Sequence, residues 1–305
     1  MTAGAAATAR CAGCGAPGLA DDRFCEACGV RRDDPRDHVE VPLPGLAAVS
    51  DRGHRHLHNE DAVALRVLPA GDGRGPTRIA VLCDGVSSAP RPDLASLAAA
   101  DAVADALAAP VGDTGATEAM AAAARAGAAA VVDAGTSAGL PGPSACTFVA
   151  AVVVDGVATI GWLGDSRAYW LPRGGEPGRA LTTDDSWLAG AVAAGVMTPA
   201  DAAGDARAHA ITAWLGAGPM ADAVHVTTLD PAGAGTLLLC TDGLWNDHPS
   251  AEALAAVLTT DPASDPLAAA RELVAAALQR GGRDNATAAV LPMAGPGTGT
   301  AEATP

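Results

Sequence analysis

Four aspartates stand at the ends of apolar segments that are predicted to be strands. Asp84 ends "RIAVLCDG", Asp242 ends "TLLLCTDG", Asp165 closes "WLGDSR", and Asp284 opens the last strand in "GGRDNATAAV". A single Asp-Gly would be a turn, but an apolar strand brings its end to the rim of the core, so four such ends predict a shared cleft. Converging carboxylates repel one another unless cations neutralise them, and oxygen ligands of this kind suit Mg²⁺ or Mn²⁺.

Four cysteines near the N-terminus have the spacing of a structural zinc site. They form C-x-x-C, ten residues, and a second C-x-x-C: Cys11, Cys14, Cys25 and Cys28. The glycine after each pair, Gly15 and Gly29, can take positive φ and let backbone N–H groups point at the sulfurs. The alternative, a redox dithiol pair, needs a thioredoxin-like βαβ context that the sequence lacks. The spacing therefore predicts one structural Zn²⁺ in a zinc ribbon over residues 1–32.

The segment "HRHLHNED" places His54, His56 and His58 directly before Glu60 and Asp61. Alternate positions on a strand share a face, so one hypothesis is a histidine zinc site of a hydrolase. Histidines two residues apart are also common in polar loops. A metal site, a proton relay and a loop beside a carboxylate site therefore stay open on the histidines alone.

The elements that must position these residues are read from hydrophobic pattern and propensity. Strands are expected at 46–53, 77–85, 236–243 and 285–293, with an antiparallel hairpin around the Asp-Gly turn at 155–156. Helices are expected at 94–109, 117–134, 187–204, 251–258 and 266–280. This order predicts an α+β domain over 46–293 with a mostly antiparallel sheet. Residues 33–45 are predicted to be an extended linker and residues 294–305 a disordered tail.

Composition excludes several classes of function. The chain has 305 residues, a formal net charge of −16 and 19 dispersed basic residues, so neither nucleic acid nor an anionic membrane surface is an expected partner. The N-terminal stretch lacks the pattern of a signal peptide, which predicts a cytoplasmic protein. The longest apolar stretch is broken by Asp155 and Gly156, so no membrane insertion is expected.

Six ordered motifs between residues 45 and 293 resemble the type 2C metal-dependent protein phosphatases of bacteria. They are "SDRG…NED", "CDG", "GDSR", "LTTDDS", "LCTDGLW" and "GGRDNAT". The resemblance implies a four-layer α-β-β-α sandwich, in which two mostly antiparallel sheets are flanked by helices. It also implies a cytoplasmic role in bacterial signalling.

The resemblance implies a site for two ions. Asp84 is expected to bridge two Mn²⁺ or Mg²⁺ ions, Gly85 to lend its carbonyl, and Asp242 and Asp284 to hold the first ion. Asn285 is expected to orient the turn. Two such ions, roughly 3.5 to 4 Å apart, would hold a hydroxide for in-line attack on phosphorus. The three aspartates are thus the expected catalytic residues.

A third, weaker ion is implied as well. Glu60 matches a ligand of the second ion that acts through water, and Asp61 is its supporting neighbour. Asp165 matches a ligand of a third ion, which it shares with Asp242. The partner expected four residues after Asp242 is Asn246 here, so this third site is expected to be weak.

Two departures from the family pattern concern the substrate. The arginine that binds the phosphate in the family is replaced by His56, whose imidazolium would be a weak substitute at lower pH. Arg55 and Arg52 are the other two candidates, because a guanidinium offers a bidentate fork. The segment after Gly85 is Val86-Ser87-Ser88, without the histidine that serves as a general acid in some relatives.

The leading hypothesis is a phosphatase that hydrolyses phosphoserine or phosphothreonine in proteins. The expected partners are phosphorylated proteins, such as a serine/threonine kinase or its substrates. The alternative is a catalytically weakened sensor that binds phosphoproteins on the same fold. Its basis is His56 and the 86–88 segment, whereas the retained carboxylates argue for the enzyme.

Overall fold

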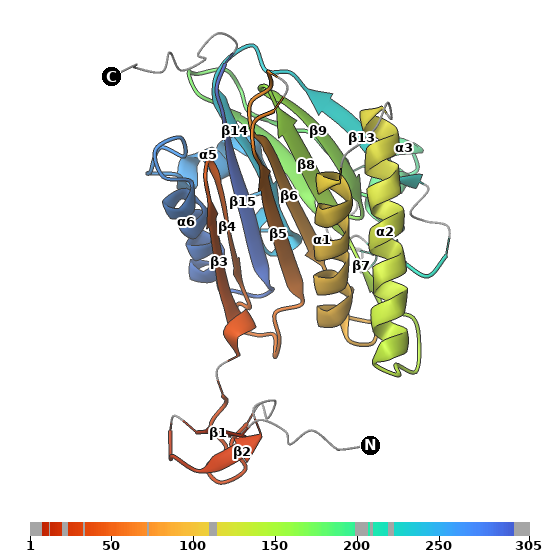
Figure 1. Cartoon of the computed structure of the whole chain (residues 1–305), viewed down its shortest axis with the longest axis vertical. Helices are drawn as coiled ribbons and strands as arrows, with labels where there is room; N and C mark the ends of the chain where they lie inside the picture. The colour runs from red at the N-terminus through yellow and green to blue at the C-terminus, as the bar shows by residue number, and fades with distance from the viewer. Residues whose placement is uncertain are drawn as a thin grey trace.

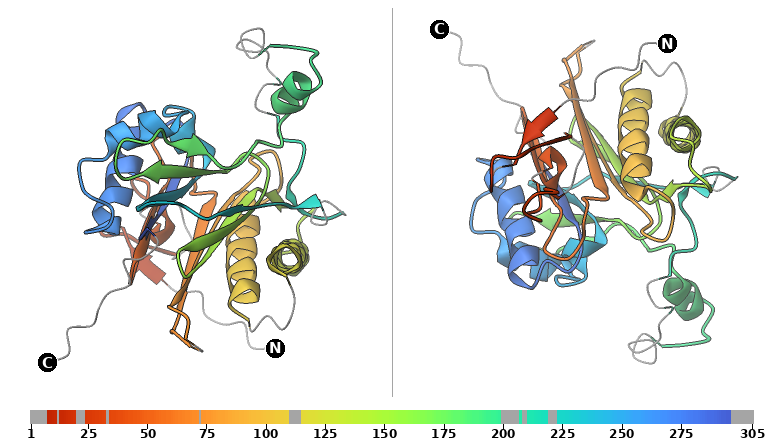
Figure 2. Two further views of the ribbon diagram at one scale, coloured as in Figure 1. Left: turned by 90° about the horizontal axis from the view of Figure 1, so that it is seen from above. Right: turned by 90° about the horizontal axis from the view of Figure 1, so that it is seen from below.

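A computed structural model describes residues 8–11, 13–19, 24–32, 34–71, 73–109, 115–198, 207, 210–218 and 223–295. Two antiparallel sheets pack face to face, and helices cover the outer face of each (Figure 1). The views along the long axis show the two sheets between the helical layers (Figure 2). The expected four-layer α+β sandwich is therefore confirmed.

The first sheet has six strands in the order β11-β10-β14-β15-β4-β3. Their bounds are Arg179–Ala180, Arg167–Pro172, Gly235–Cys240, Ala286–Met293, Leu46–Asp51 and His38–Leu43. All neighbours are antiparallel.

The second sheet has five strands in the order β13-β9-β8-β6-β5, again all antiparallel. Their bounds are His225–Leu229, Val157–Leu163, Phe148–Val154, Thr77–Asp84 and Asp61–Leu68. Asp155 and Gly156, at φ 49° and 82°, form the tight turn between β8 and β9. The Asp-Gly turn predicted from the sequence is therefore correct. A two-stranded sheet of β7 (Ala145–Cys146) and β12 (Leu215–Gly216) adjoins it.

Helices α1 (Pro92–Ala108) and α2 (Ala116–Ser137) cover the five-stranded sheet. Helices α4 (Asp242–Trp245), α5 (Ala251–Val257) and α6 (Pro266–Gln279) cover the six-stranded sheet. Small residues allow α2 to lie close to its neighbours: a Cβ added at Gly127 would come within 2.6 Å of Val103. None of the helices in the described ranges has both the length and the apolar composition to cross a membrane.

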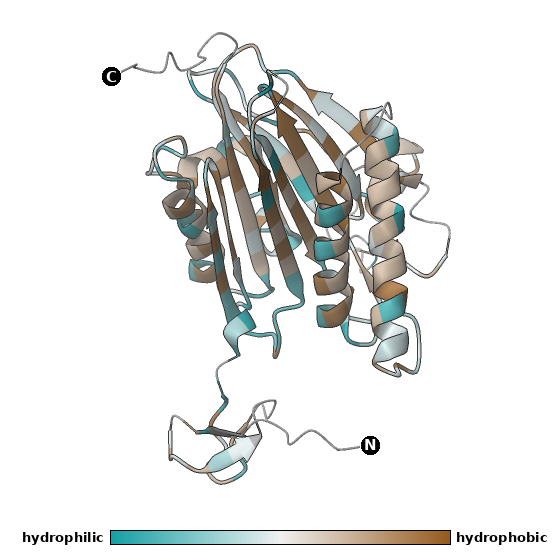
Figure 3. Cartoon of the chain, in the orientation of Figure 1, coloured by the Kyte–Doolittle hydropathy of each residue, from teal (hydrophilic) through white to brown (hydrophobic). Residues whose placement is uncertain are grey.

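Strands with both faces covered are apolar throughout. In β14, Leu237 and Leu239 face the other sheet, while Leu238 and Cys240 face the helical layer. Strand β6 alternates in the same way, and the brown central strands of Figure 3 show the result. Charged residues on such strands are therefore confined to the strand ends. Asp84 stands at the end of β6, and Asp242 follows the end of β14.

Two sequence expectations need correction. Residues 33–45 are not simply a linker, because His38–Leu43 pair with β4 as strand β3, after a 3₁₀ turn at Pro35–Asp37. Pro42 is compatible with this strand because β3 lies at the sheet edge, where a missing N–H is tolerated. The helix expected at 187–204 is shorter: α3 spans Trp187–Ala193, and Gly195 at φ 67° follows its end. Residues 199–206 and the expected tail from 296 onward lie outside the described residues.

The N-terminal segment forms a small separate unit. Strands β1 (Thr8–Arg10) and β2 (Pro17–Leu19) make an antiparallel hairpin, which lies beyond one end of the sandwich (Figure 1). Its four cysteine sulfurs all lie within 4.8 Å of one another. The cysteines predicted to bind zinc are therefore brought together.

Candidate active site

The predicted carboxylates are delivered by both sheets to one end of the sandwich. Asp61 begins β5 and Asp84 ends β6, and the two are direct partners across this strand pair. Asp165 lies in the turn between β9 and β10, Asp242 follows β14 as the first residue of α4, and Asp284 lies just before β15.

The electrostatics of these carboxylates show that they share one site. Burial raises the pKa of Asp84 well above its usual range, and the charges of Asp61, Asp242, Asp165 and Asp284 raise it further. Burial and the neighbouring acids raise the pKa of Asp242 in the same way. Burial, with Asp184 nearby, raises the pKa of Asp165 to about 6. Ionised carboxylates are therefore destabilised here unless positive charge is supplied.

Asp61 is held by two buried hydroxyl groups. Thr241 and Thr287 donate to its Oδ2 at 2.8 and 2.7 Å. Its Oδ1 is buried and has no hydrogen-bond partner among the described residues. Burial raises the pKa of Asp61 to about 7, against the effect of the two hydroxyls. A buried carboxylate with one unsatisfied oxygen is the expected state of a site arranged for a cation.

Glu60 lies beside the end of β6. Its carbonyl accepts from the N–H of Gly85 at 3.1 Å, and its Oε2 accepts from the Ser87 hydroxyl at 2.6 Å. Its own N–H donates to the Asn285 side chain at 2.8 Å. Ser87, in the segment that departs from the family pattern, thus orients the Glu60 carboxylate.

Asn285 fastens the loop that contains the histidines. Its amide group donates to the carbonyls of Arg52 at 2.7 Å and His58 at 3.0 Å, and its side chain is almost fully buried. This places it as an orienting residue rather than as part of the carboxylate cluster.

Four polar residues that support the site were not singled out from the sequence: Thr241, Thr287, Ser50 and Asn59. Ser50 pairs with Thr287 at 2.7 Å and accepts from Asn59 at 2.8 Å, so the network under Asp61 is continuous. These residues could have been found in the sequence as hydroxyl groups within or beside otherwise apolar strands, or, for Asn59, as an amide next to the Glu60-Asp61 pair.

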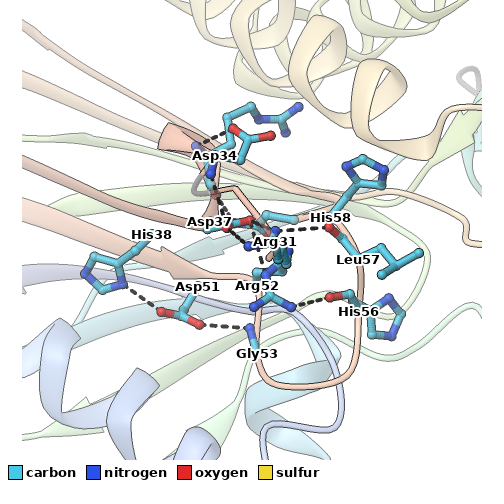
Figure 4. A network of polar contacts seen from close by, with 12 residues as sticks. Arg31, Asp34, Asp37, His38, Asp51, Arg52, Gly53, His56, Leu57 and His58 are labelled. Carbon is cyan, nitrogen blue, oxygen red and sulfur yellow. Dashed lines mark hydrogen bonds and ion pairs between the residues drawn. The ribbon is translucent and has the colours of Figure 1, made fainter. Parts of the chain in front are cut away.

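The three candidates for binding substrate phosphate are placed differently, and Figure 4 labels two of them, Arg52 and His56. His56 Nε2 lies 3.2 Å from Asp284 Oδ1, at the edge of the carboxylate cluster. Arg52 is directed to Asp37, 3.2 Å from its Nε, and also donates to the carbonyl of His56. Arg55 is exposed. His56 therefore contacts the carboxylate cluster, whereas Arg52 is engaged with Asp37 and the His56 carbonyl.

The motifs around Asp165 interlock. Arg167 binds both carboxylate oxygens of Asp184, at 2.8 and 2.7 Å, and its guanidinium lies 3.4 Å from the centre of the Trp245 ring. Trp245 in turn donates from its indole N–H to the carbonyl of Asp165 at 2.9 Å. Residues from "GDSR", "LTTDDS" and "LCTDGLW" thus form one structural unit that fixes the Asp165 turn.

Asn246 occupies the position of the expected third-ion partner. Its amide donates to Asp242 Oδ2 at 3.1 Å. A neutral amide supplies less charge to a cation than a carboxylate would, and the third site stays a prediction.

The donor set of the site fits Mg²⁺ or Mn²⁺, because the residues gathered here are carboxylates and a backbone carbonyl. Glu60, Asp61, Asp84, Gly85, Asp165, Asp242 and Asp284 are the residues that could hold such ions. Within the described ranges, the four cysteines are the group whose ligand atoms all lie within 4.8 Å. Among the described residues, the carboxylates of the site do not form so tight a group.

Fold and site together define a metal-dependent phosphatase with a four-layer sandwich. The family model for Protein phosphatase 2C matches residues 51–279. The chain therefore belongs to the protein phosphatase 2C family, and it is a protein serine/threonine phosphatase. No curated protein matches it significantly.

Solved structures of bacterial serine/threonine phosphatases have the same fold as this chain. The serine/threonine phosphatase PstP/Ppp of Mycobacterium tuberculosis is 28% identical, with a TM-score of 0.65 over 82% of this chain and 98% of that chain. The PstP catalytic domain in complex with 2 manganese ions is 28% identical, with a TM-score of 0.61 over 82% and 97% of the two chains. Stp1 from Staphylococcus aureus, 22% identical with a TM-score of 0.68 over 85% and 98%, shows the same fold.

Proposed function

We propose that this phosphatase hydrolyses phosphoserine and phosphothreonine in proteins with two divalent ions, Mn²⁺ or Mg²⁺. The observation that carries the proposal is the convergence of acids from both sheets, where Asp61 and Asp84 are direct partners across β5 and β6 and Asp242 follows β14. The charges of the neighbouring acids accordingly raise the pKa of Asp84 and of Asp242. Acids that destabilise one another serve a purpose when cations bind them.

We assign the ligands as the resemblance to the family implies. Asp84 and the carbonyl of Gly85 would serve both ions, and Asp242 and Asp284 would hold the first. Glu60 would act on the second ion through water, with Asp61 as its supporting neighbour. Asp165 and Asp242 would hold a third, weaker ion.

When bound, two ions would lower the pKa of a water molecule towards neutrality and offset charge on the phosphoryl oxygens. The chain's own residues supply orientation. Ser87 fixes the Glu60 carboxylate, Asn285 fixes the loop before it, and Thr241 and Thr287 fix Asp61. The segment Val86-Ser87-Ser88 contains no side chain that can act as a general acid. We therefore assign no proton donor for the leaving oxygen to this segment.

Phosphate recognition is proposed for His56 and Arg55. His56 faces Asp284 at 3.2 Å, and Arg55 is exposed beside it. Arg52, the third candidate, is already bound to Asp37 and to the carbonyl of His56. The expected substrates are phosphorylated proteins, including a serine/threonine kinase or the proteins it modifies.

The N-terminal unit, residues 1–32, is proposed to be a zinc ribbon with one structural Zn²⁺. The Sγ atoms of Cys11 and Cys28 are 3.7 Å apart, and those of Cys14 and Cys25 are 3.5 Å apart. Backbone N–H groups lower the pKa of Cys11 to about 6, while hydrogen bonds with the other thiols help to raise the pKa of Cys28 to about 12. Crowded thiols of this kind are expected where a metal takes them all as thiolates. Residues 38–293, which include the edge strand β3, are proposed as the catalytic domain.

A phosphoprotein sensor is the second candidate, because His56 replaces the expected arginine and residues 86–88 lack the usual histidine. The two candidates differ in turnover. Purified protein should hydrolyse phosphopeptides with Mn²⁺, and it should lose this activity with a chelator and in Asp242→Ala. Binding of phosphopeptides without turnover, in metal-supplemented protein, would establish the sensor instead.

A further inference from the structure

Arg31 belongs structurally to the ribbon. Its backbone pairs with Phe24, the residue before Cys25, and the Cys25 N–H donates to the carbonyl of Val30 at 2.8 Å. The position of the Arg31 backbone is therefore set by the same turn that presents Cys25 and Cys28 to the metal.

The Arg31 side chain reaches out of the ribbon to the catalytic domain. Its guanidinium donates to both oxygens of Asp37, with an Nη2–Oδ1 distance of 2.7 Å, and to the carbonyl of Leu57 at 3.2 Å. Leu57 lies in the loop of residues 52–58, which we call the histidine loop (Figure 4). One ribbon side chain thus contacts both the histidine loop and the acid beside it.

Asp37 connects the same ribbon arginine to the base of the histidine loop. Its carboxylate also pairs with Arg52 at 3.2 Å, and its carbonyl accepts from the Arg52 N–H at 2.8 Å. Arg52 then donates to the carbonyl of His56. The side chains of Arg31, Asp37 and Arg52 are mostly buried, so solvent screens these contacts less than it would screen surface pairs.

Two sets of contacts hold the middle of the histidine loop: those from Arg31 and Arg52, and the contact of His56 Nε2 with Asp284 Oδ1 at 3.2 Å. Its two ends are fastened elsewhere, by Asn285 and by the bond from the His54 N–H to the Gly282 carbonyl. At its centre the Leu57 side chain is 58% exposed and offers little packing. The carbonyl of His56 accepts a hydrogen bond from Arg52, and that of Leu57 accepts one from Arg31.

We propose that Arg31 and Asp37 are positioning residues through which the folded ribbon holds the histidine loop, and with it His56, against the catalytic site. The expected change in KM rests on the proposed function, whereas the expected change in the mobility of the histidine loop does not. Metal binding in the ribbon and phosphate recognition at the active site are thereby coupled through one arginine–aspartate–arginine chain.

The test compares Arg31→Ala and Asp37→Asn with Arg271→Ala in the full-length protein. Two nitrogens of Arg271 likewise donate to the carboxylate oxygens of Glu40, at 2.8 and 2.6 Å. This pair joins α6 to β3, and within the described part of the chain Arg271 makes no hydrogen bond to the loop. Arg31→Ala and Asp37→Asn should raise the KM for a phosphopeptide about fivefold with kcat changed less than twofold. Arg271→Ala should leave both constants unchanged, and Arg31→Lys, which keeps the charge but loses the fork, should fall between.

Amide hydrogen exchange over residues 54–58 gives a readout independent of activity. Exchange there should accelerate in Arg31→Ala, in Asp37→Asn and in the zinc-free Cys25→Ser, but not in Arg271→Ala. Combining Cys25→Ser with Arg31→Ala should add little to either single change, because both break the same connection.

Unchanged exchange over 54–58 in Arg31→Ala and Cys25→Ser would overturn the proposal. Equal loss of kcat and rise in KM, with exchange accelerated throughout the domain, would also overturn it, because that result indicates general destabilisation. If no variant and no wild-type protein turns over phosphopeptide, the proposed function fails, while the exchange comparison still decides whether the ribbon holds the loop.

Discussion

Asp61 and Asp84 face each other as direct partners at the end of the β5–β6 pair. Two acids placed opposite one another destabilise a strand pair, and here both are also buried. The sheet tolerates this arrangement because Thr241 and Thr287 bind Asp61 from below. The hydroxyl groups do not neutralise the negative charge of Asp61 and Asp84, so bound cations are expected to do so.

This relationship predicts how the metal-free protein responds to pH. Burial raises the pKa of Asp61 to about 7 and that of Asp165 to about 6, above their values in the unfolded chain. The folded state then takes up protons before the unfolded state does, so stability rises as pH falls through this range. We expect the Tm of chelator-treated protein to be about 4 °C higher at pH 6 than at pH 8.

Thermal melts with and without Mn²⁺ measure this effect. Saturating Mn²⁺ should raise the Tm at pH 8 and reduce its dependence on pH, because the cations replace the protons. A metal-free Tm that is lower at pH 6 than at pH 8 would contradict the prediction.

Thr241→Val should weaken metal binding without changing any ligand. The change removes the 2.8 Å hydrogen bond to Asp61 and the 3.0 Å bond that the Thr241 hydroxyl accepts from the Thr287 N–H. We expect a loss of stability of about 1 to 2 kcal/mol and weaker Mn²⁺ binding by calorimetry. Thr236→Val is the matched control, since Thr236 is a buried threonine near the start of β14, the strand that ends directly before Thr241. Equal Mn²⁺ affinity in the two variants would argue against a role for Thr241 at the site.

His56→Arg should strengthen phosphate recognition. A guanidinium at this position offers two parallel donors to a phosphate, whereas a neutral imidazole offers one. The expected result is a KM for phosphopeptide lower by about tenfold, measured with Mn²⁺ at pH 8. Arg55→Ala is the comparison: a large rise in KM there, with no gain in His56→Arg, would assign the phosphate to Arg55.

Cys25→Ser should remove the ribbon metal and leave the catalytic ions in place. Elemental analysis of the wild type after dialysis is expected to give one zinc per chain, because four thiolates close the coordination shell. Asp242→Ala should retain that zinc. Wild-type protein without zinc would refute the ribbon assignment.

Much of the site could be predicted from the sequence because its acids follow apolar strands. Asp84 and Asp242 stand out where β6 and β14, covered on both faces, reach the rim. The supporting residues could not be found in this way. Thr241 and Thr287 have no spacing that distinguishes them from threonines that only pack in a strand.

The same limit applies to the fold. The Asp155–Gly156 turn was predictable because its backbone demands are local. Strand β3 was not, because Pro42 and Pro44 indicate a linker, and only pairing with β4 shows that residues 38–43 complete the sheet edge. The partner of Arg52 was equally hidden, because Asp37 lies outside all six motifs.

The ribbon and strand β3 are separated by a short segment. From Arg31 to His38 the chain can extend at most about 25 Å. A phosphoprotein held by the ribbon would therefore be tethered close to the catalytic domain, at an effective concentration in the millimolar range. For a tethered substrate, a low affinity of the active site for the phosphate group would no longer limit turnover.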